Sequence, residues 1–343
     1  MKAKRLLSGA LALGIAMSMS MTAFAEESAK LTKVYSAVNE GTSSPEETFT
    51  FTEPVNISIT DAAEGTVAPK IVVDSVTFSA GEAKKDAVLA DGKAVNIHLA
   101  DGEAWTSVGV YTYSFSEVNG NVRGVSYKSE TMYVKVTVTN AAAGGYEATY
   151  AVYTDGEPGK STKNNSFTNT YSAGSLTVTK DVEGKLGDKN KAFTICVTLT
   201  NAKKDGLTVK SDITITLPDG STQTLAASDW NTPYYTVVDF DLKDGESVTL
   251  SNIPYGVVYQ VDELDYSSEG YTTTYEGENT ATVRGMVRGT LDSASESAKV
   301  INTKDPEIDT GISLDSLPYV MMLAIAGAGL VVFLAKKRSM RED

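Results

Sequence analysis

The chain has very little cysteine and histidine for its length. Its 343 residues include one cysteine, Cys196, and one histidine, His98. One cysteine cannot form an intramolecular disulfide, and most metal and redox sites need several such ligands. The sequence also lacks the Asp-x-Asp-x-Asp-Gly pattern of a calcium loop. We therefore predict no metal and no cofactor, with Cys196 a small buried side chain and His98 an ordinary strand or turn residue.

Basic residues are also scarce. The whole chain has 30 Lys and Arg against 44 Asp and Glu, for a net charge of −14. Residues 26–310, which exclude two unusual ends, have 23 basic and 41 acidic residues and a net charge of −18. Nucleic-acid binding requires a basic surface, so a nucleic-acid partner is excluded.

The first 25 residues are typical of a secretory signal peptide. A basic start, Met1–Arg5, precedes a mostly apolar or small stretch, and Ala23-Phe24-Ala25 has the small-x-small pattern of a signal peptidase site. We expect residues 1–25 to be removed and the mature protein to be secreted, beginning at Glu26. An exported protein of this length without disulfides must be stabilised by its core or by another crosslink.

The other end, residues 305–343, is predicted to be a cell-wall sorting signal. Leu317–Leu334 contains 18 residues without a charge, and Lys336–Arg338 follows as a basic stop, which predicts a short transmembrane segment. The preceding residues, Glu307–Gly311, resemble the Leu-Pro-x-Thr-Gly motif that sortases cleave between Thr and Gly. Only the last two positions of that motif match. The alternative is a permanent single-span membrane anchor.

Cleavage by a sortase would fall between Thr310 and Gly311. The predicted partners are then a sortase transpeptidase and the peptidoglycan. The protein would be held in the membrane only as a transient precursor, before it is joined to the cell wall.

The region between the two ends is predicted to be all-β. In several runs, β-branched or aromatic residues recur at every second position, and turn signals such as Asp219-Gly220 separate the runs. Such a pattern is typical of an antiparallel sandwich, and we expect two tandem immunoglobulin-like β-sandwich domains, residues 26–172 and 173–304. The clearest runs are Thr48–Thr52, Tyr133–Val138, Ser175–Thr179 and Asp212–Leu217.

The two halves repeat one set of polar residues in the same order. Each half has a Lys in its opening strand, a Glu after a central aromatic run and an Asn in its closing strand. The Lys and Glu are 84 residues apart in one half and 83 in the other. Lys30 competes with Lys33 for the first position, and we prefer Lys33. The two sets are Lys33, Glu117, Asn169 and Lys180, Glu263, Asn302.

These residue types predict a self-made crosslink. First and last strands of a sandwich often lie side by side, so that the Lys can face the Asn while the Glu comes from the opposite sheet. Burial would lower the Lys pKa and leave a neutral nucleophilic amine, and would push the Glu toward its protonated form, able to donate to the Asn oxygen. Attack on the Asn carboxamide would release ammonia and form an isopeptide bond. This reaction occurs once per site, so the protein is not an enzyme.

With these motifs, residues 26–311 resemble Gram-positive backbone (major) pilins of the streptococcal T-antigen type, which have tandem isopeptide-forming domains. The resemblance is carried by the Ala29–Lys33 run, Glu117, Phe167–Asn169, the Leu176–Lys180 run, Val261–Glu263 and Ile301–Asn302. It implies that Glu117 and Glu263 catalyse crosslinks from Lys33 to Asn169 and from Lys180 to Asn302.

The resemblance further implies a covalent polymer. A sortase would join Thr310 of one subunit to a lysine of the next, shortly before Asn169, for which Lys163 and Lys160 are the candidates. The predicted function is a structural subunit of a surface pilus, with other copies of itself as partners and a host surface ligand as a further candidate. The alternatives are a monomeric wall-anchored adhesin or stalk, and a secreted glycan-binding module or hydrolase.

Overall fold

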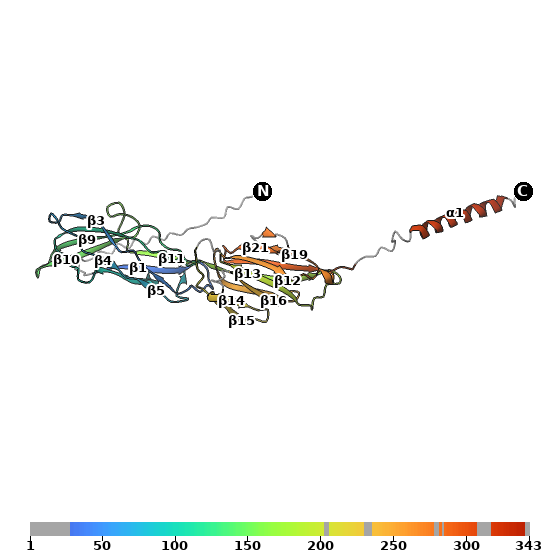
Figure 1. Cartoon of the computed structure of the whole chain (residues 1–343), viewed down its shortest axis with the longest axis horizontal. Helices are drawn as coiled ribbons and strands as arrows, with labels where there is room; N and C mark the ends of the chain where they lie inside the picture. Colours follow the sequence, from blue (N-terminus) through green and yellow to red (C-terminus); the bar gives the residue numbers. More distant parts are fainter. Residues whose placement is uncertain are drawn as a thin grey trace.

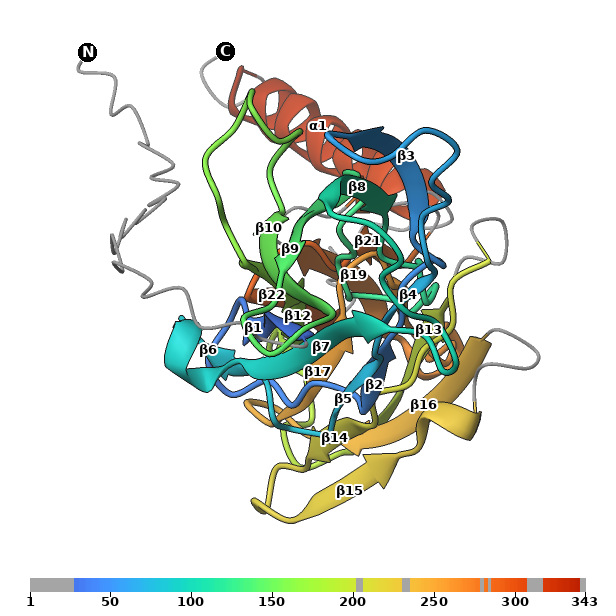
Figure 2. The ribbon, with the colours of Figure 1, turned by 90° about the vertical axis from the view of Figure 1, so that its left-hand side faces the viewer.

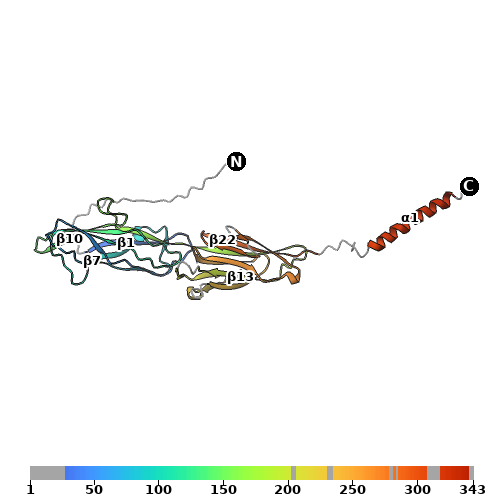
Figure 3. The ribbon, with the colours of Figure 1, turned by 45° about the horizontal axis from the view of Figure 1, so that its top comes forward.

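The computed structural model describes residues 28–201, 206–229, 235–277, 281–282, 285–306 and 317–339. The predicted signal peptide, 1–25, and the predicted cleavage site, Thr310–Gly311, lie outside the described residues. Within the described part, strands and three short 3-10 turns are the regular elements between residues 28 and 306, which confirms the all-β prediction. The strands form two elongated lobes that follow one another along the molecule's long axis (Figure 1, Figure 3).

The first lobe contains two facing sheets. One has the strand order β11-β1-β7-β4 with β6 added beside β1, and the other has the order β10-β9-β8-β3. A short pair, β2 and β5, and a 3-10 turn, Leu89–Asp91, complete it. The bounds are β1 Ser28–Ala37, β2 Glu47–Phe49, β3 Val55–Thr60, β4 Ile71–Val73, β5 Val76–Phe78, β6 Lys84–Lys85, β7 Lys93–Leu99, β8 Gly109–Phe115, β9 Met132–Asn140, β10 Tyr146–Tyr153 and β11 Ser166–Tyr171.

The second lobe also has two sheets, and each contains one strand more than its counterpart in the first lobe. Its sheets have the orders β15-β14-β17-β12-β22-β19 and β16-β13-β18-β21-β20. The 3-10 turns are Ala227–Asp229 and Ser267–Glu269. The bounds are β12 Ala173–Glu183, β13 Phe193–Thr200, β14 Ile213–Thr216, β15 Thr222–Leu225, β16 Tyr235–Leu242, β17 Ser247–Pro254, β18 Val258–Glu263, β19 Thr272–Gly277, β20 Ala281–Thr282, β21 Val287–Thr290 and β22 Ser295–Thr303.

In both lobes the opening strand lies parallel to the closing strand. β1 pairs with β11 in a register that sets Lys33 opposite Phe167 and Tyr35 opposite Asn169. β12 pairs with β22 in the same manner, with Lys180 opposite Val300 and Val182 opposite Asn302. In each case the Asn pairs with the residue two positions after the Lys. Because side chains two apart share a face of a strand, each Lys and its Asn point to the same side.

That side is the core of each lobe. Strands β9 and β13 alternate buried and half-buried residues along their length, as period-two patterning predicts. β12 buries Leu176, Val178 and Val182 on one face, and Lys180 stands in the same row with its side chain fully buried. A charged residue therefore occupies a position that the strand pattern reserves for apolar side chains.

Polar contacts join the two lobes. Only Ser172 separates β11 from β12. Glu47 of the first lobe is 2% exposed and accepts hydrogen bonds from Tyr127 Oη at 2.8 Å and from Lys210 Nζ of the second lobe at 2.7 Å. The buried Arg123 donates to Asn201 across the same boundary.

Beyond residue 316 the structure describes one α-helix, α1, Leu317–Ser339. It covers the apolar stretch for which a transmembrane segment is predicted. Among the residues described, no helix reaches the combination of length and hydropathy that a membrane crossing requires.

Candidate functional site

Lys33 is fully buried in the first lobe, although its amine carries a charge at neutral pH in water. It lies in the middle of β1, and its Nζ is 4.2 Å from the ring centre of Phe49 and 3.9 Å from that of Phe167. Aromatic faces attract a cation, but they replace water poorly as a hydrogen-bond partner. The site therefore needs an acceptor for the amine. Lys30, the competing candidate, is exposed on the same strand.

Glu117 supplies that acceptor from the opposite sheet. It follows β8 and makes an isolated bridge with Phe51, which brings its side chain under β1. Its Oε1 accepts a hydrogen bond from Lys33 Nζ at 2.7 Å, and its Oε2 accepts one from Asn169 Nδ2 at 2.8 Å. The amine and the carboxamide thus bind the two oxygens of one buried carboxylate.

In the second lobe Lys180 lies beside Glu263, and Asn302 is on the strand paired with that of Lys180. Lys180 Nζ lies 3.3 Å from Glu263 Oε1, and both side chains are fully buried. The amine also donates to the carbonyl oxygens of Asp181 at 3.1 Å and Val300 at 3.3 Å. Its Nζ stands 4.6 Å from the ring centre of Phe193.

Asn302 is the most unusual residue of the second site. It is fully buried, and within the described part of the chain neither its Nδ2 nor its Oδ1 has a hydrogen-bond partner. An unpartnered buried amide costs about 1–3 kcal/mol. Conversion of this carboxamide to a crosslink would remove the unpartnered Nδ2 as ammonia and so relieve part of that cost.

Burial shifts both amines in the direction that nucleophilic attack needs. The loss of water around Lys33 lowers its pKa to about 7, and nearby Lys128 adds to this, while Glu117 opposes it. Burial also lowers the pKa of Lys180, against the opposing effect of Glu263. A neutral amine is the nucleophilic form, and at the first site it is well populated at neutral pH.

One feature of the first site differs from expectation. The sequence suggested that the Glu donates to the Asn oxygen, whereas the structure turns the Asn169 nitrogen toward Glu117. That nitrogen is the leaving group of the proposed reaction. In this orientation the carboxyl group is placed to deliver a proton to the departing ammonia.

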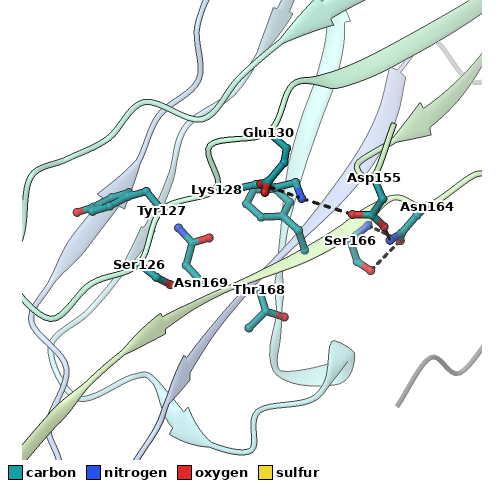
Figure 4. A pocket seen from close by; sticks show the side chains of 10 residues that line it. Ser126, Tyr127, Lys128, Glu130, Asp155, Asn164, Ser166, Thr168 and Asn169 are labelled. Atoms are coloured by element: carbon teal, nitrogen blue, oxygen red, sulfur yellow. Dashed lines mark hydrogen bonds and ion pairs between the residues drawn. The ribbon is translucent and has the colours of Figure 1, made fainter. Parts of the chain in front are cut away.

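An open pocket of about 410 Å³ reaches the first site from outside. Figure 4 shows Asn169 and Tyr127 on one side of it and Lys128, Glu130 and Asp155 on the other. The backbone N–H of Lys128 donates to Glu117 Oε2 at 2.6 Å, and its Nζ lies 3.4 Å from Asp155. Lys128 was not singled out by sequence, because a backbone donor leaves no residue-type signal.

The two acceptor candidates lie in the loop between β10 and β11. Lys160 is exposed and forms an ion pair with Glu157 at 2.6 Å, and Lys163 is exposed three residues later. Neither belongs to a strand, so strand alternation does not distinguish them. Both amines are open to solvent.

Cys196 differs from expectation. It is half-exposed on the outer face of β13, because Ile195 and Val197 take the inward positions of the alternating strand. Partial burial and Asp239 raise its pKa to about 12, which leaves the thiol unreactive at neutral pH. His98 is a strand residue whose ring nitrogens contact Leu99 O and Asp74.

Comparison with known proteins agrees with this architecture. A family model described as a Spy0128-like isopeptide containing domain matches residues 29–172, and a domain of unknown function matches residues 174–304. The crystal structure of the major pilin from Streptococcus pyogenes aligns with a TM-score of 0.54 and 24% identity, covering 82% of this chain and 99% of that one. The T3.2 major pilin of the same species aligns with a TM-score of 0.53 and 22% identity over the same shares. These two likenesses establish the fold.

A sequence relative establishes the family. A pilin of Streptococcus pyogenes serotype M1 is 32% identical over 240 residues, which cover 67% of this chain and 68% of that protein. Together with the isopeptide-domain match over the first lobe, this likeness shows that the chain belongs to the pilin family, as a structural subunit of a cell-surface pilus.

Proposed function

We propose that this chain is the backbone subunit of a covalent pilus and that each lobe is closed by an isopeptide bond which the lobe forms itself. The observation that carries this proposal is the shared placement of Lys33 and Asn169 on the two oxygens of Glu117. The second lobe supports it with a buried Lys180–Glu263 ion pair and with Asn302 on the strand that lies parallel to that of Lys180.

The chemistry follows from these contacts. Neutral Lys33 attacks the Asn169 side-chain carbonyl carbon, and Glu117 Oε1 takes a proton from the amine. The bond between Cγ and Nδ2 then breaks, a proton passes from Glu117 to Nδ2, and ammonia leaves. Counted from the buried ion pair, the Lys33 ammonium loses two protons and Nδ2 gains one, so Glu117 ends protonated and a neutral amide and a neutral carboxyl group replace two charges whose desolvation is costly.

Each bond would tie the first strand of a lobe to its last. Lys33 and Asn169 are 136 residues apart, and a crosslink over a loop of that length stabilises a fold by about 5 kcal/mol in the chain-entropy model. Pulling on the two ends of a lobe would load this covalent bond. The hydrogen bonds between the strands would carry little of the force, which suits a fibre under tension.

Assembly would use the C-terminal signal. In this proposal a sortase cleaves between Thr310 and Gly311 and transfers the Thr310 carboxyl group to a lysine of the next subunit. The precursor would stay at the membrane until cleavage, and the last subunit would be joined to peptidoglycan. Lys160 and Lys163 fit the acceptor role because both amines are exposed in a loop.

A boiled wall extract tests the polymer directly. Covalent multimers withstand boiling in detergent, so a ladder of bands is expected for the unaltered chain. Replacing the acceptor lysine by Arg keeps the charge and should collapse the ladder to a single band. Lys160→Arg and Lys163→Arg made separately identify which residue serves.

Lys135→Arg, at a half-buried position within β9, is the matched control and should leave the ladder intact. A single band from the unaltered chain would show that the protein acts as a monomeric stalk.

A further inference from the structure

Strand β19 flanks the second crosslinking site, whereas in the first lobe the corresponding edge is covered only by a loop with one isolated bridge, Val125 to Tyr171. Strand β19 pairs with β22 on the side away from β12, whereas β11 is the edge strand of its sheet. The pairing is antiparallel and sets Thr273 directly opposite Asn302. Directly opposed residues project to the same face of a sheet, about 5 Å apart at Cβ, so the Thr273 hydroxyl lies beside the Asn302 carboxamide.

Two side chains of β19 also bind Glu263, which ends β18. Thr273 Oγ1 donates to Glu263 Oε2 at 3.0 Å, and the backbone N–H of Glu263 donates to the hydroxyl of Tyr275 at 3.2 Å. One carboxylate oxygen and the backbone of Glu263 are thereby fixed by two residues of β19. The other oxygen, Oε1, lies 3.3 Å from Lys180 Nζ as an ion pair.

The first site fixes its carboxylate by different means. There the loop Ser126–Lys128 runs along β11, with Ser126 N donating to Thr170 O at 2.8 Å. The loop supplies a backbone N–H, from Lys128, to Glu117 Oε2. Besides the Asn169 amide, the donor to Oε2 in the first lobe is therefore a backbone group, whereas in the second lobe it is a side-chain hydroxyl.

We propose that Thr273 is a positioning residue of the second crosslinking site, an inference that rests on the proposed isopeptide chemistry. Its hydroxyl anchors Oε2 so that Oε1 faces the amine. As Lys180 Nζ attacks Cγ of Asn302, Oε1 takes one proton from the amine. The carboxyl group returns a proton to Nδ2 as the Cγ–Nδ2 bond breaks and ammonia leaves. Thr273 itself exchanges no atom in the reaction.

The test compares the two sites within one molecule. The full chain is made by cell-free synthesis, sampled at intervals and digested, and mass spectrometry measures the Lys180–Asn302 and Lys33–Asn169 crosslinked peptides. Thr273→Val and Thr273→Ala remove the hydroxyl, and Thr273→Ser keeps it. Thr274→Val, at the exposed next position of the same strand, is the matched control.

We expect the Val and Ala variants to slow the second crosslink by about tenfold or more, the effect of losing one hydrogen bond to a buried carboxylate. The Ser variant should restore the rate to within about threefold, and the first crosslink should form at the same rate in every variant. Resistance of the second lobe to protease, measured in parallel, reports whether it is folded.

Equal second-site rates in the unaltered chain and in the Val and Ala variants would overturn the positioning role while leaving the proposed function intact. Failure of both hydroxyl-free variants to fold, with Ser and Thr274→Val folding normally, would overturn it as well, because the hydroxyl would then serve the fold. Absence of both crosslinks from the unaltered chain would instead overturn the proposed function itself.

Discussion

A buried lysine between aromatic rings is the residue on which the first site depends. Lys33 is buried away from solvent, and its hydrogen bond to Glu117 partly offsets the lost hydration. An isolated buried charge is among the most costly features a fold can contain. A bond that consumes the amine turns this cost into a stable neutral group, which gives a physical reason for keeping a lysine in a core position.

The lowered pKa of Lys33 predicts how bond formation depends on pH. Since burial holds this pKa at about 7, below the usual value near 10.4, the amine is mostly charged at pH about 6 and mostly neutral at pH about 8. Only the neutral amine attacks. The first crosslink should therefore form about tenfold more slowly at pH about 6 than at pH about 8, and level off above that.

Quenched samples of newly made protein, analysed for the Lys33–Asn169 peptide, give the rate at each pH. A rate that is flat from pH about 6 to 8, or that falls with rising pH, would contradict attack by an amine with this pKa.

At the scale of the elements, the parallel pairing of first and last strands decides whether a bond can form. β1 and β11 come from opposite ends of the first lobe's sequence and lie side by side for six residue pairs. The crosslink would add a covalent tie to that pairing. Without it, the two strands are held by hydrogen bonds and by the packing of their buried faces.

Asn169→Ala should therefore destabilise the first lobe without changing its fold. Loss of a bond contributing about 5 kcal/mol should lower the melting temperature of a lobe of this size by about 15 °C. Differential scanning calorimetry measures the change. Asn140→Ala, at the exposed end of β9, is the control and should shift the transition by at most a few degrees. An equal melting temperature for Asn169→Ala and the unaltered chain would contradict a stabilising bond at this site.

The strand pattern could be predicted from sequence because it is local. Tyr133–Val138 and Ser175–Thr179 alternate in the way a half-buried strand requires, and both lie within strands of the structure. The Lys, Glu and Asn sets were found through their repetition in two halves. The structure places Lys33 and Asn169 on the two oxygens of Glu117, and in the second lobe it pairs Lys180 with Glu263.

Other features depended on contacts that local sequence does not encode. Asn119-Gly120 looks like a hairpin turn, yet the segment after it crosses to the second lobe, where Val122 pairs with Thr208. Thr273 stands in a run of three threonines, and only pairing between strands shows which one reaches Glu263. Long-range pairing decides such roles, and a single sequence does not specify it.

At the scale of the whole molecule, the boundary between lobes is held by buried polar contacts. Figure 2 views the molecule from one end, so the two lobes lie one behind the other. Asn252 adopts a left-handed backbone, φ 67°, which Asn tolerates better than most residues. Its side chain exchanges two hydrogen bonds with the backbone of Ser43, each 3.0 Å long.

Lys210 is expected to keep the lobes aligned. Lys210→Met keeps the apolar stem but removes the partner of the buried Glu47, leaving that carboxylate with Tyr127 as its remaining donor among the contacts described above. The lobes should then reorient more freely, which small-angle X-ray scattering detects as a smaller average maximum dimension. Lys243→Met, distant from this boundary, is the control. An unchanged scattering profile for Lys210→Met would show that the other contacts suffice.

The most direct test of the central claim is the intact mass of the purified protein. Each isopeptide bond removes one ammonia, so the unaltered chain should be lighter than its sequence mass by two ammonias. Glu117→Ala and Glu263→Ala should each regain one, because each removes the group that moves protons at one site. A mass equal to the sequence mass in the unaltered chain would contradict self-formed crosslinks in both lobes.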